Sequence, residues 1–344
     1  MERRCQKAAL SWGQSGQDPF VWRSEMVSIA VLDDYQKCAR ALADWSGLER
    51  QGAVTFFADP IPPGELSATL AGYDIVVLNG ERSPFGRDVI EALPGLRFVV
   101  WLRSLRASKV PSVVDMDLLH ERGIPVSGTE GLGVSMTEVT WALILSAVKR
   151  IAVEDRALRA GHWQTGMPAN LYGTTLGLAG LGVLGARMVP VARAFGMDII
   201  AWSQNLTDER AAEAGVERVS KAELLGRSDV LSIHLVLSDR TVGTFGQAEF
   251  ALMKPSAVLV NTSRGPIVEE QALIEALRNG QIGGAGLDVY WSEPLDAGHP
   301  LLALDNVVLS PHFGYVSDRS FRHVYSQIVE DIEAFLNGSP VRLM

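Results

Sequence analysis

Cysteine is scarce in this sequence. The 344 residues include only Cys5 and Cys38, with no Cys-x-x-Cys pair and no Cys/His cluster. We therefore expect neither a disulfide framework nor a metal site, and the composition favours a reducing, cytoplasmic compartment. Long apolar runs are also missing: no stretch reaches the roughly 18 residues that a membrane helix needs.

Basic residues are also fewer than acidic residues. The chain has 31 Lys and Arg against 40 Asp and Glu, a formal net charge of −9. This balance argues against nucleic acid or an anionic membrane as a partner. The hydrophobic content of 47% and the length are those of a globular protein with two domains.

Apolar strands alternate with amphipathic helices from Val27 to the end of the chain. The preceding residues 1–26 have no such periodicity and no apolar signal core, so we expect a disordered extension there. Continuous apolar strands separated by helices predict parallel sheets covered on both faces. Residues 37–48 are predicted to form one helix. A capping box at Ser135 and Glu138 predicts a long helix that continues to about Ala160 and contributes to the core or to a subunit interface.

A glycine-rich turn stands between a predicted strand and a predicted helix at Thr175 to Phe195. Its glycines, Gly180, Gly182 and Gly185, form the pattern G-x-G-x-x-G. The first permits a tight turn, the second lets the backbone approach a pyrophosphate, and the third lets helix and strand pack closely. In this context the pattern predicts a dinucleotide site, although a tight βα turn could carry the same glycines.

The strand after this helix ends at Ser203, where an acid that binds the ribose of NAD would be expected. A serine does not repel a 2′-phosphate, and no arginine stands in the immediate turn. We therefore expect NAD as cofactor, with NADP possible.

Three later strands end in residues suited to acid–base chemistry. Arg264 follows one strand, a carboxylate-rich segment that begins at Asp288 follows the next, and His312 follows the last. An arginine can hold a carboxylate substrate, and a histidine beside a carboxylate can exchange a proton with a carbonyl or hydroxyl oxygen. His234 lies inside an apolar strand and is expected to be structural. The other four histidines are expected at surface or loop positions: His120, His162, His299 and His323.

Together these segments resemble the D-isomer-specific 2-hydroxyacid dehydrogenase family. GLAGLGVLGARM, SDVLSIHLVLSDRT, VLVNTSRGPIVEE, GAGLDVYWSEPL and SPHFGYV occur in the order and spacing of the family, over roughly 135–317. The resemblance implies an α/β protein with two doubly wound parallel-sheet domains, in which a Rossmann cofactor domain (126–313) is inserted in a flavodoxin-like substrate domain (27–125 and 314–344). It also implies a homodimer formed through the helix after Ser135.

The resemblance assigns roles to single residues. The catalytic arginine, glutamate and histidine of the family match Arg264, Glu293 and His312. The expected cofactor-binding residues are Gly180, Gly182, Val183, Leu184, Gly185, Ser203, Thr262 and Asp288, of which Asp288 matches the residue that contacts the nicotinamide carboxamide. The expected reaction is reversible hydride transfer between NAD(P)H and a small 2-oxo acid, which gives a D-2-hydroxy acid.

One loop departs from the family. At 103–111 the chain has no glycine and three basic residues, Arg103, Arg106 and Lys109, where the family commonly has a glycine-containing turn. The loop is either a solvated variable loop, an altered substrate site or an impaired one. The alternatives to the reductase are a formate dehydrogenase, which Glu293 disfavours because that enzyme has glutamine there, an NAD(H)-binding sensor or corepressor, and an inactive dinucleotide binder.

Overall fold

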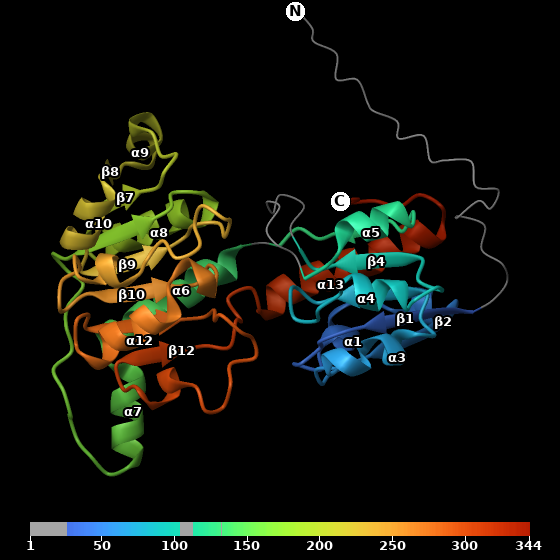
Figure 1. The fold of residues 1–344 in the computed structure, drawn as a ribbon, viewed down its shortest axis with the longest axis horizontal. Helices are drawn as coiled ribbons and strands as arrows, with labels where there is room; N and C mark the ends of the chain where they lie inside the picture. Colours follow the sequence, from blue (N-terminus) through green and yellow to red (C-terminus); the bar gives the residue numbers. More distant parts are fainter. Residues whose placement is uncertain (1–25, 104–112, 132) are drawn as a thin grey trace, which may run out of the picture. The chain divides into compact units, whose positions relative to one another are not determined.

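The computed structural model describes residues 26–103, 113–131 and 133–344. These residues divide into two units (Figure 1): 26–103, 113–131 and 321–344 form the first, and 133–320 form the second. The expected extension at 1–26, except Met26, and most of the unusual 103–111 loop lie outside the described residues. Among the described helices, none is long and apolar enough to cross a lipid bilayer.

The first unit is a five-stranded parallel sheet with the strand order β2-β1-β3-β4-β5. This is the 2-1-3-4-5 order of the flavodoxin-like doubly wound fold. Its strands are β1 (Val27–Val31), β2 (Gly52–Phe56), β3 (Ile75–Leu78), β4 (Phe98–Trp101) and β5 (Val126–Gly128). Its helical segments are α1 (Ala39–Leu42), α2 (Ser46–Glu49), η1 (Pro63–Glu65), α3 (Leu66–Leu70), α4 (Arg87–Glu91), α5 (Met116–Glu121) and the greater part of α13 (Asp318–Leu336).

The second unit is a seven-stranded parallel sheet in the order β12-β11-β10-β9-β6-β7-β8. Numbered within the unit, this is the Rossmann order 3-2-1-4-5-6 with a seventh strand added. The strands are β6 (Thr175–Ala179), β7 (Asp198–Trp202), β8 (Glu217–Arg218), β9 (Val230–Ile233), β10 (Val258–Asn261), β11 (Gly284–Leu287) and β12 (Val307–Leu309). Its helical segments are α6 (Val134–Val148), α7 (Ile151–Arg159), α8 (Val183–Ala194), α9 (Asp208–Ala214), α10 (Lys221–Arg227), α11 (Gln247–Phe250), η2 (Gly265–Ile267), α12 (Glu270–Arg278) and η3 (Pro300–Ala303).

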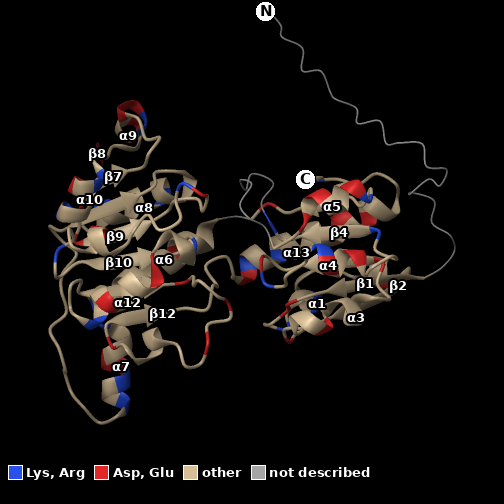
Figure 2. Cartoon of the chain, in the orientation of Figure 1, with Lys and Arg blue, Asp and Glu red and all other residues tan. Residues whose placement is uncertain are grey.

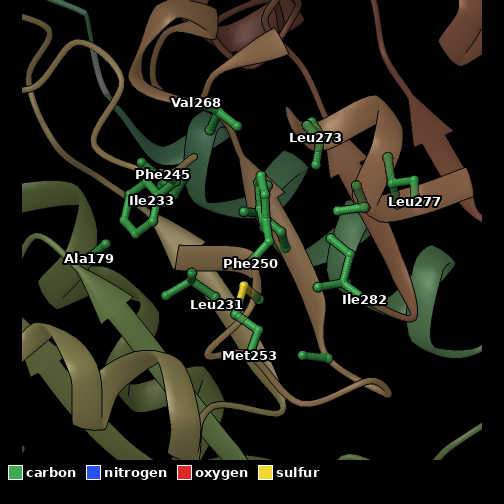
Figure 3. Packing of buried hydrophobic residues seen from close by; sticks show 14 of the residues in the cluster. Ala179, Leu231, Ile233, Phe245, Phe250, Met253, Val268, Leu273, Leu277 and Ile282 are labelled. Carbon is green, nitrogen blue, oxygen red and sulfur yellow. The ribbon is translucent and has the colours of Figure 1, made fainter. Parts of the chain in front are cut away.

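Hydrophobic side chains cover both faces of this second sheet. One cluster joins the sheet to α10, α11 and α12 through fully buried residues such as Phe250 and Leu273 (Figure 3), and the other joins it to α6 and α8 through Ile144 and Met188. Charged residues lie mainly on helices and loops (Figure 2), and β6, β9, β10 and β11 carry none. The prediction of two doubly wound parallel sheets is confirmed, because both sheets have doubly wound strand orders and their central strands, such as β3, β4, β9 and β10, are buried on both faces.

The predicted long helix is wrong in two respects. It breaks at Lys149 and Arg150, where Arg150 has a φ of 56°, so α6 and α7 are separate helices. The predicted capping box at its start is absent, because α6 is capped by Gly133 and Ser135 lies inside the helix. The predicted helix at 37–48 is likewise two short helices, α1 and α2, separated around Trp45.

The boundaries between the two units differ from the domain boundaries expected at 125/126 and 313/314. Residues 126–131 lie in the first unit, because β5 pairs with β4 there. Residues 314–320 lie in the second unit, where the Gly314 N–H donates to the Asp288 carboxylate.

Candidate functional site

The glycine-rich loop lies at the switch point of the second sheet, between β6 and its neighbours β7 and β9. Gly180 has a φ of +105°, and a Cβ there would lie 2.6 Å from the His234 carbonyl oxygen. At Gly185 a Cβ would lie 2.2 Å from the Gly180 carbonyl oxygen. Only glycine fits these two positions, and together they bring the start of α8 against the end of β6.

The N-terminus of α8 is open. Gly182 caps the helix without a side-chain hydrogen bond, and a Cβ at Gly182 would meet no atom within 4 Å. The backbone N–H groups of Val183 and Leu184 have no partner within the helix, because the first intrahelical bond runs from the Ala186 N–H to the Gly182 carbonyl. Open backbone donors at the positive end of a helix dipole fit the pyrophosphate of a dinucleotide.

Ser203 directly follows β7 and is half-buried, where an acid for the ribose hydroxyls was expected. His234, predicted inside a strand, instead follows β9, which ends at Ile233. Its ring nitrogen Nε2 lies 2.9 Å from the Ser232 hydroxyl. Burial lowers the pKa of His234 to about 4, so the ring is neutral near pH 7. His234 thus has a hydrogen-bond partner within its own segment, and its structural role stays a prediction.

Arg264 lies in the loop after β10. The buried side chain of Asn261 shapes this loop, because its amide donates to the Arg264 carbonyl at 2.9 Å and accepts from the Ser263 N–H at 3.0 Å. Gly265 then passes so close to the next loop that a Cβ would lie 2.2 Å from the carbonyl of Tyr290. This contact joins the loop that carries Arg264 to the loop that carries Glu293.

Glu293 and His312 form a direct pair. The His312 Nδ1 atom lies 2.5 Å from the Glu293 Oε2 atom, and the other carboxylate oxygen accepts the Tyr290 N–H at 2.9 Å. Because β10, β11 and β12 are neighbours in the sheet, the loops after them carry Arg264, Glu293 and His312 to one edge. The pairing at Nδ1 leaves Nε2 as the ring nitrogen that can exchange a proton with a substrate.

The charge of Glu293 is maintained by its surroundings. Burial alone would raise the pKa of this carboxyl, but the hydrogen bond and charge of His312, the Tyr290 N–H and the Arg264 guanidinium together lower it below its usual value. Glu293 is therefore an anion at neutral pH, and its carboxylate faces the Nδ1 atom of His312.

Asp288 is fully buried beneath the His312 loop. Its carboxylate accepts hydrogen bonds from the Ser310 hydroxyl at 2.5 Å and from the N–H groups of Phe313 and Gly314 at 3.1 and 2.9 Å. These bonds flank His312, whose φ of 50° lies in the left-handed region. The contacts hold the loop on which His312 stands.

The structure brings most of the predicted residues of the second unit to this edge. Thr262 also lies there, buried at the end of β10, with its hydroxyl 2.9 Å from that of Thr140. Asn261 and Ser310 were not among the predicted residues, and only their positions at strand ends could have indicated them. Of the unusual basic loop, the described residue Arg103 forms an ion pair with Glu81 at 3.2 Å. Across the described residues no cluster of three or more His, Cys, Asp or Glu could hold a metal ion.

The protein is thus an α/β protein of two units, and its second unit carries a glycine-rich loop that fits a dinucleotide. Arg264, Glu293 and His312 lie on loops at one edge of the same sheet. A family model for the D-isomer specific 2-hydroxyacid dehydrogenase NAD-binding domain matches residues 141–314. A glyoxylate reductase from Aeropyrum pernix is 41% identical over 235 residues, which are 65% of this chain and 70% of that protein. A hydroxypyruvate reductase from Blautia hydrogenotrophica is 30% identical, with 92% of this chain and 99% of that protein covered.

Solved structures agree with these matches. A phosphoglycerate oxidoreductase from Vibrio cholerae superposes with a TM-score of 0.84 at 34% identity, over 91% of this chain and all of that chain. The chain therefore belongs to the D-isomer-specific 2-hydroxyacid dehydrogenase family, and residues 141–314 form its NAD-binding domain.

Proposed function

We propose that the protein is an NAD(H)-dependent reductase of a small 2-oxo acid such as glyoxylate or hydroxypyruvate, which it converts to a D-2-hydroxy acid. The observation that carries this proposal is the 2.5 Å contact between Glu293 and His312 at the sheet edge that also bears Arg264. The relatives named glyoxylate reductase and hydroxypyruvate reductase support the substrate class.

In this proposal each residue of the trio has its own role. Arg264 holds the substrate carboxylate through its guanidinium fork. Protonated His312 donates from Nε2 to the carbonyl oxygen, and Glu293 stabilises the charged imidazole and orients its ring through Nδ1. The nicotinamide, when bound, supplies the hydride. Gly180, Gly182, Gly185 and the N-terminus of α8 would hold its pyrophosphate, with Ser203 and Thr262 beside the rest of the cofactor. Asp288, whose carboxylate is fully buried, would act on the cofactor only through the loop that carries His312.

Ser203 supports a further part of the proposal, that NADPH is also accepted. A serine in place of the ribose-binding acid places no negative charge against a 2′-phosphate. We further propose a cytoplasmic location, in keeping with a chain of only two cysteines.

The protein is also proposed to be a homodimer. The arm formed by residues 151–170 contains α7, none of whose side chains is buried in its own unit. Ile151, Leu158, Trp163 and Met167 of this arm are 58%, 56%, 76% and 92% exposed. Apolar side chains at this exposure are typical of a protein interface, and a second copy of the chain is the partner that we propose.

The test of the proposed reaction is NADH and NADPH oxidation with glyoxylate, hydroxypyruvate, pyruvate, phenylpyruvate and 2-oxoisocaproate. His312→Gln should lower kcat by about 100-fold or more, because the proton donor is lost, and should leave NADH binding intact. His120→Gln, an exposed histidine on α5, is the matched control and should retain full activity. Full turnover by His312→Gln would refute the role of His312, and NADH binding without turnover on any acid would favour a sensor.

A further inference from the structure

Glu293 lies in a loop whose two ends are stacked on each other. The loop, residues 291–299, begins with Trp291 and ends with His299. The rings of these two residues are nearly parallel, with an interplanar angle of 11° and centroids 6.4 Å apart. The stack closes the loop and limits the positions that Glu293 can take.

Both ends of the loop are also anchored to one short segment of the chain. The Trp291 Nε1–H donates to the Val268 carbonyl at 2.6 Å, and the His299 Nε2 atom lies 2.8 Å from the Glu270 Oε1 atom. Val268 and Glu270 follow directly on the turn that begins at Arg264. The segment that starts with Arg264 therefore also holds the loop that carries Glu293.

The hydrogen bonds of His299 fix its tautomer. The Leu301 N–H donates to His299 Nδ1 at 3.2 Å, so Nδ1 must carry a lone pair and the proton must be on Nε2. The ring thus caps η3 with one nitrogen and donates to Glu270 with the other. Each ring nitrogen therefore has its own partner within the protein.

His299 lies in a loop, as the sequence suggested, but only 11% of its side chain is exposed. The stack, the cap and the bond to Glu270 all act on the loop around Glu293. Beyond this loop, Glu293 contacts Tyr290 and His312. The position of its carboxylate therefore depends on how firmly the two loop ends are held.

We propose that His299, together with Trp291, is a positioning residue for Glu293. The two rings form a brace between the 291–299 loop and the 264–270 segment, and the brace keeps the Glu293 carboxylate in hydrogen-bond contact with His312. The kinetic consequence of the brace rests on the proposed function, but its structural consequence does not.

The test uses His299→Asn, whose side-chain oxygen can still cap the Leu301 N–H but which loses the stack and the bond to Glu270. We expect kcat to fall about tenfold while the Kd for NADH changes by less than about twofold. The pH at which kcat/KM falls to half on the alkaline side should move toward that of Glu293→Gln. Glu270→Ala should show the same pattern more weakly, and Glu275→Ala, an exposed control on the same helix, should show none.

Two further measurements separate positioning from general destabilisation. In a Glu293→Gln background, His299→Asn should cause no further loss of kcat, because the residue acts through Glu293. Hydrogen exchange should become faster in His299→Asn at the amides of 291–299 and remain unchanged in β10, β11 and β12.

The proposal is overturned if the loss of kcat is the same in both backgrounds, or if exchange in the 291–299 loop does not change. Faster exchange throughout the three strands would also overturn it. A wild-type protein that oxidises NADH with none of the acids would refute the proposed function alone, because the exchange measurement would still decide whether the brace exists.

Discussion

Gly182 and Gly185 lie three residues apart but face different surroundings. A methyl group at Gly185 would meet backbone at 2.2 Å, whereas one at Gly182 would point into open space. Gly185→Ala should therefore lower the free energy of unfolding by about 2 kcal/mol, because the start of α8 has to move away from β6. Urea denaturation measures this difference.

Gly182→Ala should leave the stability unchanged and weaken NADH binding about tenfold, because its methyl group would occupy the space that a pyrophosphate needs. Fluorescence titration with NADH measures the affinity. A Gly182→Ala protein that binds NADH as tightly as the wild type would show that the phosphates do not approach this residue.

Residues at strand ends were predictable from the sequence, but their surroundings were not. Arg264, Glu293 and His312 could be placed on one edge because parallel neighbouring strands end together. The brace around His299 could not be predicted, because the ring stack on Trp291 and the hydrogen bond to Glu270 join residues in separate segments. Sequence spacing carries no signal for such contacts, and His299 therefore resembled an ordinary loop histidine.

At the scale of elements, α13 carries a buried acid. Asp331 is fully buried, its Oδ1 atom accepts the Arg342 Nε–H at 2.8 Å, and its Oδ2 atom has no partner among the described residues. Burial raises the pKa of Asp331 to about 7, although the charge of Arg342 opposes this and that of Glu330 adds to it. The C-terminal segment that carries Arg342 pairs with β5 through the Arg342 carbonyl and the Gly128 N–H.

This acid should make stability depend on pH. Between its unfolded pKa of 3.8 and its folded pKa of about 7, the folded state keeps a proton that the unfolded state has lost. The contribution of Asp331 to stability is therefore fully present below pH 3.8 and is lost as the pH rises toward 7.

We expect the free energy of unfolding of the wild type, relative to Asp331→Asn, to fall by roughly 2–4 kcal/mol between pH 4.5 and 7.5. Urea denaturation across that range measures it. Glu330→Gln removes a charge that raises the pKa of Asp331, so it should make the wild-type slope shallower, but less so than Asp331→Asn does. Parallel curves for the wild type and Asp331→Asn would contradict a proton held by Asp331.

Helices show where local patterns fail. Ser135 and Glu138 have the spacing of a capping box, but Gly133, with a φ of 63°, turns the chain into α6 two residues earlier. At Ser220 and Glu223, which have the same spacing, a capping box does form, with both of its reciprocal hydrogen bonds. The two motifs look alike in sequence, and only the direction from which the chain enters the helix distinguishes them.

At the scale of the whole molecule, polar contacts hold the arm of residues 151–170, and no residue of its helix α7 is fully buried. The Thr165 N–H and hydroxyl both bind the Glu154 carboxylate, at 3.0 and 2.8 Å, so the returning segment is tied to α7. These hydrogen bonds hold the segment around Thr165 against α7, while the apolar side chains of the arm stay exposed. A second copy that covers them would stabilise a helix that has no fully buried residue in its own unit.

The proposed dimer predicts that the wild type has twice the chain mass of 37.3 kDa in sedimentation equilibrium at micromolar concentration. Leu158→Glu should shift the population toward the monomer, because a carboxylate would have to be buried in the interface. Leu302→Glu, at a site 51% exposed outside the arm, is the matched control and should leave the mass unchanged. A wild type that sediments as a monomer would refute the dimer. A Leu158→Glu protein that remains dimeric would place the interface elsewhere, because a buried charge at this position would cost more than the contact supplies.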